Sequence, residues 1–219
     1  MNGPGTAERV EGSRRLRAAQ RCARLACAAL ARLEIHGLEH VPASGGVVLV
    51  ANHRALMDGV VLFGTLDRVV SCLVKTEAFR GPLAPILRGC AQIPVHRERV
   101  DPAPVHLGVE LLLAGGVLGV FPEGTRGDGQ VSHAKPGAGY FAMRSGAAVV
   151  PVALHGTREM VRRRSLRRPV VRMIAAAPIC VERHPDDAVL ARRAFTEVTE
   201  GIRVRLAALV AETTGETGG

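Results

Sequence analysis

The apolar residues of this chain fall into short continuous runs separated by longer segments of helical character. The run at 47–51 reads VVLVA, and similar Val- and Leu-rich runs recur along the chain. Runs without an alternating polar position are typical of strands buried on both faces of a parallel sheet. The predicted strands are 47–51, 69–74, 92–95, 117–121, 148–154 and 170–175. The predicted helices are 58–66, 82–88, 103–114, 138–145 and 186–212.

The alternation of these elements predicts an α/β fold. Strands that alternate with helices form a sheet whose two faces are both covered. We therefore expect a single domain over residues 34–219, with a mostly parallel central sheet flanked by helices.

A different kind of segment precedes this domain. Residues 13–33 are rich in Ala, Leu and Arg and contain neither Gly nor Pro, which predicts a helix. Most of its arginines fall on one side, as in a basic amphipathic helix. Such a helix can lie on an anionic bilayer, or its apolar face can pack on the domain with the arginines in water. We divide the chain into residues 1–33, a disordered start followed by this helix, and residues 34–219.

Composition narrows the class of protein. Of the 219 residues, 47% are hydrophobic and 22% are charged, as in a soluble or peripherally attached globular protein. No run of about eighteen apolar residues occurs, and the first residues lack the apolar segment of a secretory signal, so we expect a cytoplasmic protein. The five cysteines are scattered without a C-x-x-C pair. This spacing argues against a zinc site and against a disulfide framework, and no metal site is expected.

The formal net charge of +9 implies a negatively charged partner. The candidates are nucleic acid, an anionic membrane surface and phosphorylated substrates. Nucleic acid is disfavoured, because aromatic residues make up only 3% of the chain and Trp is absent. Because Arg greatly outnumbers Lys, part of the charge also fits a bias in genome composition. We expect an anionic membrane surface, and no nucleic acid, among the partners.

The first chemically informative segment follows the apolar run at 47–51. It reads NHRALMDG and carries His53 and Asp58 in the turn before a predicted helix. A carboxylate that accepts from one imidazole nitrogen fixes the tautomer, and the other nitrogen can then take a proton from a hydroxyl. For this pair alone the structural alternative is an Asp58 N-cap beside a hydrogen-bonded loop histidine.

Three further polar clusters each follow a predicted strand. They read QIPVHRE at 92–98, FPEGTRG at 121–127 and VVPVALHGT at 149–157. Ligands of α/β sheets gather at the carboxyl ends of the strands, so we expect all four clusters at one edge of the sheet.

The clusters together resemble the glycerolphosphate acyltransferase family, typified by 1-acylglycerol-3-phosphate O-acyltransferase. The N-H-x-S-x-x-D motif of that family is matched by Asn52, His53 and Asp58, with Ala55 where serine is usual. Its second motif ends in an aspartate-arginine pair, of which this chain shares only the arginine, in His96-Arg97.

Other motifs of the family are matched in the same order. F-P-E-G-T-R is complete at 121–126, and a V-P-V run follows at 150–152. The segments KTE at 75–77 and KPG at 135–137 also resemble recurrent positions. The resemblance extends from residue 37 to residue 179. Condensation domains of peptide synthetases carry a similar H-H-x-x-x-D-G segment, but they repeat the histidine, place the pair one residue closer and need a much longer chain.

The resemblance implies a general base and a phosphate site. His53 would deprotonate the acceptor hydroxyl and later protonate the leaving thiolate, while Asp58 would orient it. Arg97 and Arg126 would hold the acceptor's phosphate, which a guanidinium can bind through two parallel hydrogen bonds. Glu123 would bind acceptor hydroxyls or anchor one of these arginines.

Gly124 and Thr125 complete the implied substrate-binding set. At Gly124 the lack of a side chain would allow the backbone to approach the ligand closely. The implied reaction needs no cofactor beyond the acyl thioester substrate.

The function implied by the resemblance is transfer of a fatty acyl group from acyl-CoA or acyl carrier protein to the 2-hydroxyl of 1-acylglycerol 3-phosphate, giving phosphatidic acid. We expect such a protein to be peripheral on the inner face of the cell membrane. Alternatives within the class are acylation of glycerol 3-phosphate or of another lipid or metabolite hydroxyl. The alternative from another class is a non-catalytic lipid- or nucleic-acid-binding protein, which would have no need to keep all of His53, Asp58, Glu123 and Arg126.

Overall fold

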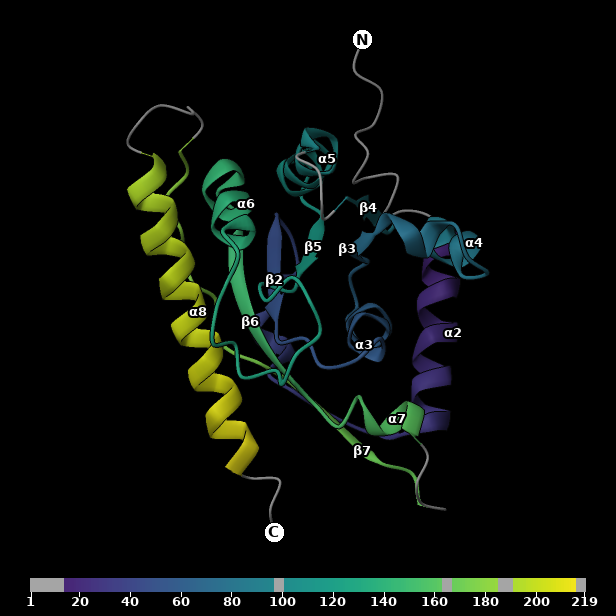
Figure 1. The fold of residues 1–219 in the computed structure, drawn as a ribbon. Helices are drawn as coiled ribbons and strands as arrows, with labels where there is room; N and C mark the ends of the chain where they lie inside the picture. Colours follow the sequence, from purple (N-terminus) through teal and green to yellow (C-terminus); the bar gives the residue numbers. More distant parts are fainter. Residues whose placement is uncertain (1–13, 97–100, 163–166, 185–190, 216–219) are drawn as a thin grey trace.

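A seven-stranded sheet forms the centre of the computed structural model, which describes residues 14–96, 101–162, 167–184 and 191–215 (Figure 1). The strands are β1 (Arg32–His36), β2 (Val47–Ala51), β3 (Val70–Lys75), β4 (Ile93–Val95), β5 (Val117–Val120), β6 (Ala148–His155) and β7 (Val170–Ala175). The α-helices are α2 (Arg14–Leu30), α3 (Met57–Thr65), α4 (Ala84–Gly89), α5 (Pro102–Leu113), α6 (Gly137–Ser145), α7 (Glu159–Arg162) and α8 (Ala191–Gly215). Two short 3-10 helices are η1 (Leu38–His40) and η2 (Thr76–Phe79).

The strand order is β1-β7-β6-β2-β5-β3-β4. The five strands from β6 to β4 are mutually parallel. Strand β7 pairs antiparallel with β6, and β1 pairs parallel with β7. The predicted α/β fold with a mostly parallel sheet is therefore confirmed, and the reversed direction of β1 and β7 is an addition to it.

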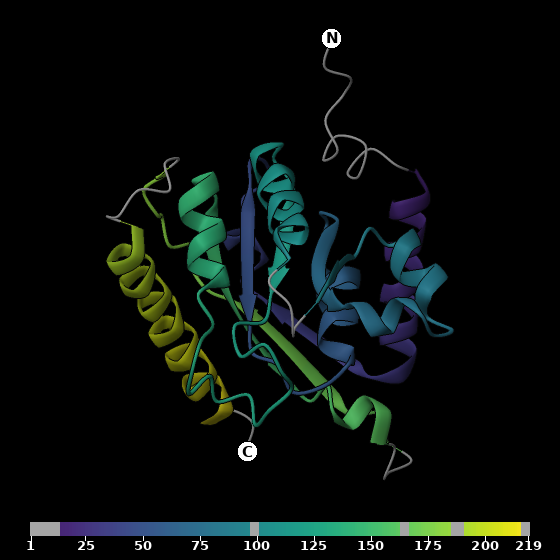
Figure 2. The same cartoon turned by 45° about the horizontal axis from the view of Figure 1, so that its top comes forward.

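Helices cover both faces of the sheet, and the apolar residues of the central strand β2 are buried on both faces. Successive residues of β2 point to opposite faces, so Val48 and Val50 belong to one core and Val47 and Leu49 to the other. The first core is closed by α5, α6 and α8, and the second by α2, α3 and α7. Figure 2 shows the two groups of helices on either side of the strands.

Helix α2 packs on the domain through one of its faces. It buries Leu16, Gln20 and Cys27, and its outward arginines are exposed. The Gln20 side-chain amide lies 3.1 Å from the carbonyl oxygen of Phe63 and 3.0 Å from that of Arg68, at the carboxyl end of α3. The packing role that we considered for this helix is thus observed. Among the described helices, none is long and apolar enough to cross a bilayer.

The boundary between the first helix and the domain differs from the expectation. The helix that we predicted to reach residue 33 ends at Leu30, and Leu33 lies within β1. The division that we placed between residues 33 and 34 therefore falls inside a strand of the sheet. The predicted disordered start, residues 1–12, lies outside the described residues.

Gly64 allows the close contact between α3 and α2. A Cβ at Gly64 would lie 2.9 Å from the backbone nitrogen of Arg24, whereas a Cβ at Gly59, on the same helix, would meet nothing within 4 Å. Gly64→Ala should lower the free energy of unfolding by about 1–3 kcal/mol, because backbone atoms of α2 must move. Gly59→Ala is the control and should raise it by about 0.4–1 kcal/mol. Urea unfolding measures both, and equal effects would contradict this account of the packing.

Candidate active site

The four polar clusters meet at one edge of the sheet because the parallel strands end there. β2 lies between β5 and β6 in the sheet, with Val50 opposite Val120 on one side and Ala51 opposite Val152 on the other. The chain leaves β2 at Asn52 and leaves β5 at Phe121. Residues of the first and third clusters are therefore neighbours.

Asn52 holds the end of β2 to β6 after the regular pairing stops. Its side chain is fully buried, its Nδ2 donates to the carbonyl oxygen of Leu154 at 3.0 Å, and its Oδ1 accepts from the Leu154 amide at 2.7 Å. These two bonds extend the pairing of β2 with β6 by one residue, and they fix the point where the chain leaves the sheet after β2. The next residue, His53, is placed by this turn.

His53 and Asp58 are in direct contact. The His53 Nδ1 lies 2.9 Å from Asp58 Oδ2, and both residues are buried. The same carboxylate oxygen accepts the backbone amides of Arg54 and Ala55, each at 2.7 Å. One oxygen thus fixes both the ring and the turn. With Nδ1–H donating to the carboxylate, Nε2 is the nitrogen that can accept a proton.

The structural alternative for Asp58 is not the observed arrangement. The N-cap of α3 is Leu56, which makes no side-chain capping bond, and Asp58 lies inside the first turn of that helix. Ala55, at the position where serine is usual in the resembled family, contributes a backbone amide to Asp58. This contact needs no hydroxyl, so the alanine leaves the turn intact.

The loop after β5 holds the backbone of His53 from both sides. The His53 amide donates to Glu123 Oε2 at 2.7 Å, and the Gly127 amide donates to the His53 carbonyl oxygen at 3.0 Å. The Phe121 ring stacks on the imidazole, with centroids 4.2 Å apart and planes inclined by 23°. We had expected Glu123 to contact acceptor hydroxyls or an arginine, and the sequence did not indicate this bond to the backbone.

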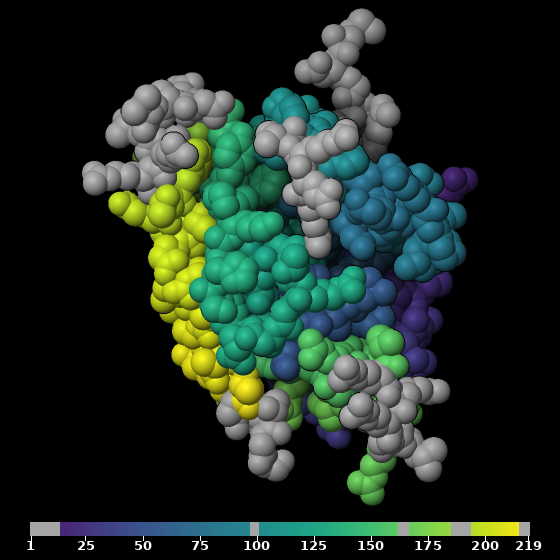
Figure 3. Space-filling view, viewed as in Figure 1, coloured from purple at the N-terminus to yellow at the C-terminus, as the bar shows by residue number. Residues whose placement is uncertain are grey.

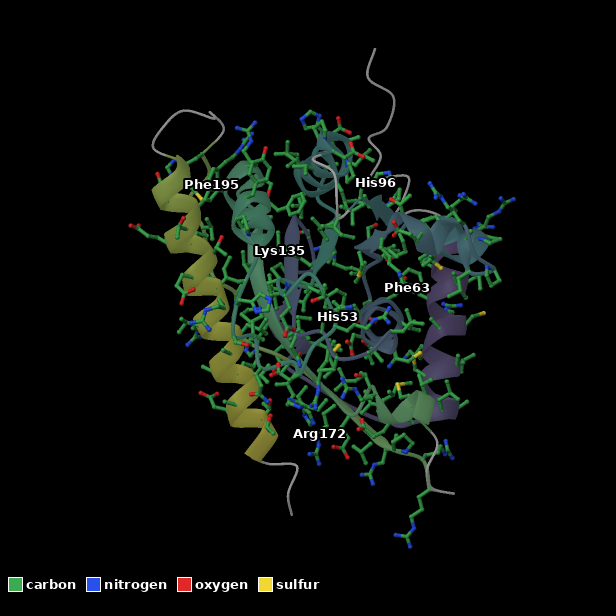
Figure 4. All side chains as sticks on the ribbon, viewed as in Figure 1. His53, Phe63, His96, Lys135, Arg172 and Phe195 are labelled. Atoms are coloured by element: carbon green, nitrogen blue, oxygen red, sulfur yellow. The ribbon has the colours of Figure 1, made fainter. Side chains whose placement is uncertain are left out.

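A large apolar cavity opens beside the imidazole. Its volume is about 690 Å³, and His53 lines it together with residues of α2, α3, β3, α4 and β4. Three of its cationic lining residues are Lys75, Arg126 and Lys135, all exposed. Figure 4 shows His53 near the centre of the molecule, with Lys135 and His96 above it in this view.

Lys135 is a site residue that its sequence position alone did not assign. Gly124 has φ +70°, and a Cβ there would lie 2.7 Å from Lys135 Cε, so the lysine stem covers the glycine. The Lys135 amide also donates to the Pro122 carbonyl oxygen at 2.8 Å. The Lys-Pro-Gly segment before α6 is thereby tied to the loop that carries Arg126.

The remaining predicted residues are placed differently. Gly124 and Arg126 line the cavity, whereas Thr125 is exposed and is not among the lining residues. Arg97 lies outside the described residues, and its neighbour His96 lines the cavity. In the part of the chain that the structure describes, no group of three or more His, Cys, Asp or Glu side chains is arranged to hold a metal ion.

Comparisons with known proteins agree with this geometry. The family model described as Acyltransferase matches residues 32–155, more than half of the chain. The chain belongs to this acyltransferase family. It is 30% identical over 126 residues to the 1-acyl-sn-glycerol-3-phosphate acyltransferase of Bacillus subtilis (strain 168), covering 57% of this chain and 63% of the relative. It is 33% identical over 157 residues to the chloroplastic 1-acyl-sn-glycerol-3-phosphate acyltransferase LPAT1 of Arabidopsis thaliana, covering 68% of this chain and 44% of the relative.

The fold of this acyltransferase is also shared with a solved structure. The crystal structure of the 1-acyl-sn-glycerophosphate (LPA) acyltransferase PlsC from Thermotoga maritima superposes with a TM-score of 0.66 at 23% identity, covering 89% of this chain and 79% of that one. The chain spans between about two fifths and two thirds of the two curated relatives described above. The likeness to PlsC supports the shared fold.

Two cysteines in the cavity wall of the acyltransferase, Cys72 and Cys90, are not activated. Burial raises the pKa of the Cys72 thiol to about 12, and burial also raises the pKa of Cys90. Both residues line the cavity. A thiol with so high a pKa stays protonated near neutral pH and is a poor nucleophile. The imidazole of His53 is therefore the stronger candidate for the chemistry.

The two hydrogen bonds from Asn52 to the Leu154 backbone, which we call the Asn52 clamp, can be tested by their effect on stability. Asn52→Ala leaves the buried amide and carbonyl groups of Leu154 without partners, so the free energy of unfolding should fall by at least about 1–3 kcal/mol. Asn52→Asp keeps an acceptor for the Leu154 amide but loses the donor, and we expect a loss in the same direction. Urea denaturation measures both, and an unchanged midpoint for Asn52→Ala would refute the clamp.

Proposed function

We propose that this acyltransferase moves a fatty acyl group from the thioester of acyl-CoA or acyl carrier protein to the 2-hydroxyl of 1-acylglycerol 3-phosphate, giving phosphatidic acid. The observation that carries the proposal is the 2.9 Å contact between His53 Nδ1 and Asp58 Oδ2, on an imidazole that lines a large apolar cavity. The two curated relatives, both named 1-acyl-sn-glycerol-3-phosphate acyltransferase, support the same acceptor.

In the proposed reaction His53 acts as a general base. Its Nε2 takes the proton from the acceptor hydroxyl as the hydroxyl oxygen attacks the thioester carbonyl carbon. The C–S bond then breaks, and the imidazolium returns the proton to the leaving thiolate. Asp58, held by two backbone amides, keeps the ring oriented and stabilises its protonated form. General base catalysis of this kind contributes about 10²- to 10⁴-fold to a rate.

The proposed phosphate site lies on the cationic side of the cavity. Arg126 and Lys135 are both lining residues, and Lys135 is fixed across Gly124. A guanidinium can bind a phosphate through two parallel hydrogen bonds, and an ammonium adds a point charge. We assign Arg126 as the main phosphate ligand, supported by Lys135, and keep Arg97 as a predicted second arginine.

The apolar part of the cavity suits a fatty acyl chain. It is walled by small residues of α2, including Ala19, Ala23 and Ala26, and by Phe63 and Val60 of α3. Transfer of an alkyl chain into such a cavity is favourable by roughly 0.8 kcal/mol per buried methylene. A chain bound there would hold its reacting end beside His53.

We also propose that the protein works as a peripheral protein on the cytoplasmic face of an anionic membrane. The formal charge of +9 supports attraction to such a surface. The exposed arginines of α2, which include Arg14, Arg17 and Arg21, add to the same attraction.

His53→Ala should abolish acyl transfer to 1-acylglycerol 3-phosphate, with a loss of at least about 10²-fold, because no base remains. Purified protein is assayed with 1-acylglycerol 3-phosphate and, in parallel, with glycerol 3-phosphate. Mass spectrometry of the products shows whether acyl transfer occurs and which acceptor is used. His106→Ala, at an exposed position on α5, is the control and should retain activity. Near-normal turnover in a folded His53→Ala variant would rule out the mechanism.

Arg126→Ala should raise the KM for 1-acylglycerol 3-phosphate by about tenfold or more, because a charge-assisted pair with phosphate is lost. The KM for the acyl donor should change much less. Arg126→Lys should restore part of the affinity, because the charge returns without the two-pronged geometry. Steady-state kinetics with each substrate varied in turn measure the split, and equal effects on both substrates would remove Arg126 from the phosphate site.

A further inference from the structure

The mouth of the cavity carries apolar side chains that are exposed to solvent. Leu56 is 53% exposed at the start of α3, and Leu83 and Ile86, at α4, are 45% and 60% exposed. All three line the cavity, so the apolar surface is continuous from the outside of the molecule to the buried imidazole of His53. We call Leu56, Leu83 and Ile86 the apolar rim.

Positive charge lies beside the α4 part of the apolar rim. Arg80 follows η2 and Arg88 lies in α4, and both are exposed. Lys75 stands on the cavity wall beside them. Among the described residues that line the cavity, none is acidic, and the acidic residue of η2 is the exposed Glu77. The charge around the rim therefore complements an anionic surface.

The position of these elements on the molecule leaves them accessible. In Figure 3 the residues of η2 and α4 project at the right of the face shown, next to the loop that follows β5. Helix α8 lies on the opposite side of the molecule in this view (Figure 1). One side of the protein thus combines exposed leucine and isoleucine with cations and the cavity entrance.

We propose that the apolar rim, with Arg80 and Arg88, is the surface that docks on an anionic phospholipid bilayer. The rim side chains enter the headgroup and acyl boundary while the arginines meet the anionic headgroups. The inference deepens the proposed function, because a lipid acceptor would pass from the bilayer into the cavity along apolar surface. It assigns the docking to the mouth of the cavity, whereas the packed face of α2 is buried against α3.

The bilayer is the occupant that best fits these features. An acidic carrier protein would also be attracted by the arginines. However, isoleucine and leucine exposed on a short helix gain more from insertion into an apolar layer than from contact with a polar protein surface. The cavity behind the rim is also apolar, which makes the surface continuous with the interior of a membrane.

The test compares two double variants that change the net charge equally. The rim variant is Arg80→Glu with Ile86→Asp, and the control is Arg205→Glu with Val204→Asp on α8. Arg205 is exposed and Val204 is 48% exposed, so each variant alters one exposed arginine and one exposed apolar residue. Sedimentation with sucrose-loaded vesicles of phosphatidylcholine and phosphatidylglycerol measures the partition coefficient, and circular dichroism with thermal unfolding checks the fold.

The rim variant should lose at least about tenfold in partition coefficient, and the control less than about threefold, because the apolar rim and Arg80 contact the bilayer whereas α8 lies on the opposite side of the molecule. Equal losses would mean that net charge alone drives binding and would overturn the proposal. It would also be overturned if neither variant lost binding or if the wild-type protein did not sediment with vesicles. If the rim variant does not fold, the single substitutions Arg80→Glu and Ile86→Asp are compared with Arg205→Glu and Val204→Asp.

Two further measurements, of carrier-protein binding and of acyl transfer, distinguish bilayer docking from the alternatives. Loss of binding to an acidic acyl carrier protein by the rim variant, with vesicle binding unchanged, would make the rim a protein-docking surface and refute the proposal. Sedimentation requires no turnover, so absence of acyl transfer would leave the vesicle result intact. If the protein catalyses acyl transfer but does not sediment with vesicles, the docking proposal is refuted and the proposed reaction still stands.

Discussion

One carboxylate oxygen organises the site. Asp58 Oδ2 accepts from the imidazole of His53 and from two consecutive backbone amides of the same turn. These three donors fix the position of the carboxylate, and the carboxylate in turn orients the ring. The orientation of the base and the shape of its loop are consequently a single property. At Ala55 the backbone amide makes this contact, so the contact does not depend on a side-chain hydroxyl.

The central position of β2 explains why this turn is rigid. Strand β6 supplies the peptide group that Asn52 binds, and the loop after β5 supplies Glu123, which accepts the His53 amide. A strand at the edge of the sheet would have only one such neighbour. Each of these bonds is buried, and losing a buried partner is costly. The imidazole is therefore held in place before any substrate binds, which is the arrangement that favours catalysis by positioned groups.

The sequence predicted the strands well where apolar runs were continuous. The ranges predicted for β2 and β7 agree with the structure, and the F-P-E-G-T-R and N-H-x-x-x-x-D segments were correctly expected at one edge. Strand β1 was missed because RLEIH alternates polar and apolar residues beside a helix rich in Ala and Arg, and its pairing with β7 is a long-range contact. The antiparallel direction of β7 also depends on tertiary contacts. The bond from His53 to Glu123 joins residues seventy positions apart, so no local pattern could indicate it.

Helix α2 contributes to the wall of the cavity and not to the His53–Asp58 pair. Alanines of α2 line the cavity, and the Gln20 side-chain amide bonds to the carbonyl oxygens of Phe63 and Arg68, towards the carboxyl end of α3. The α2 wall of the cavity and the His53–Asp58 pair therefore come from segments that are separate in the sequence. Larger side chains at these alanine positions would narrow the cavity without replacing either member of the His53–Asp58 contact.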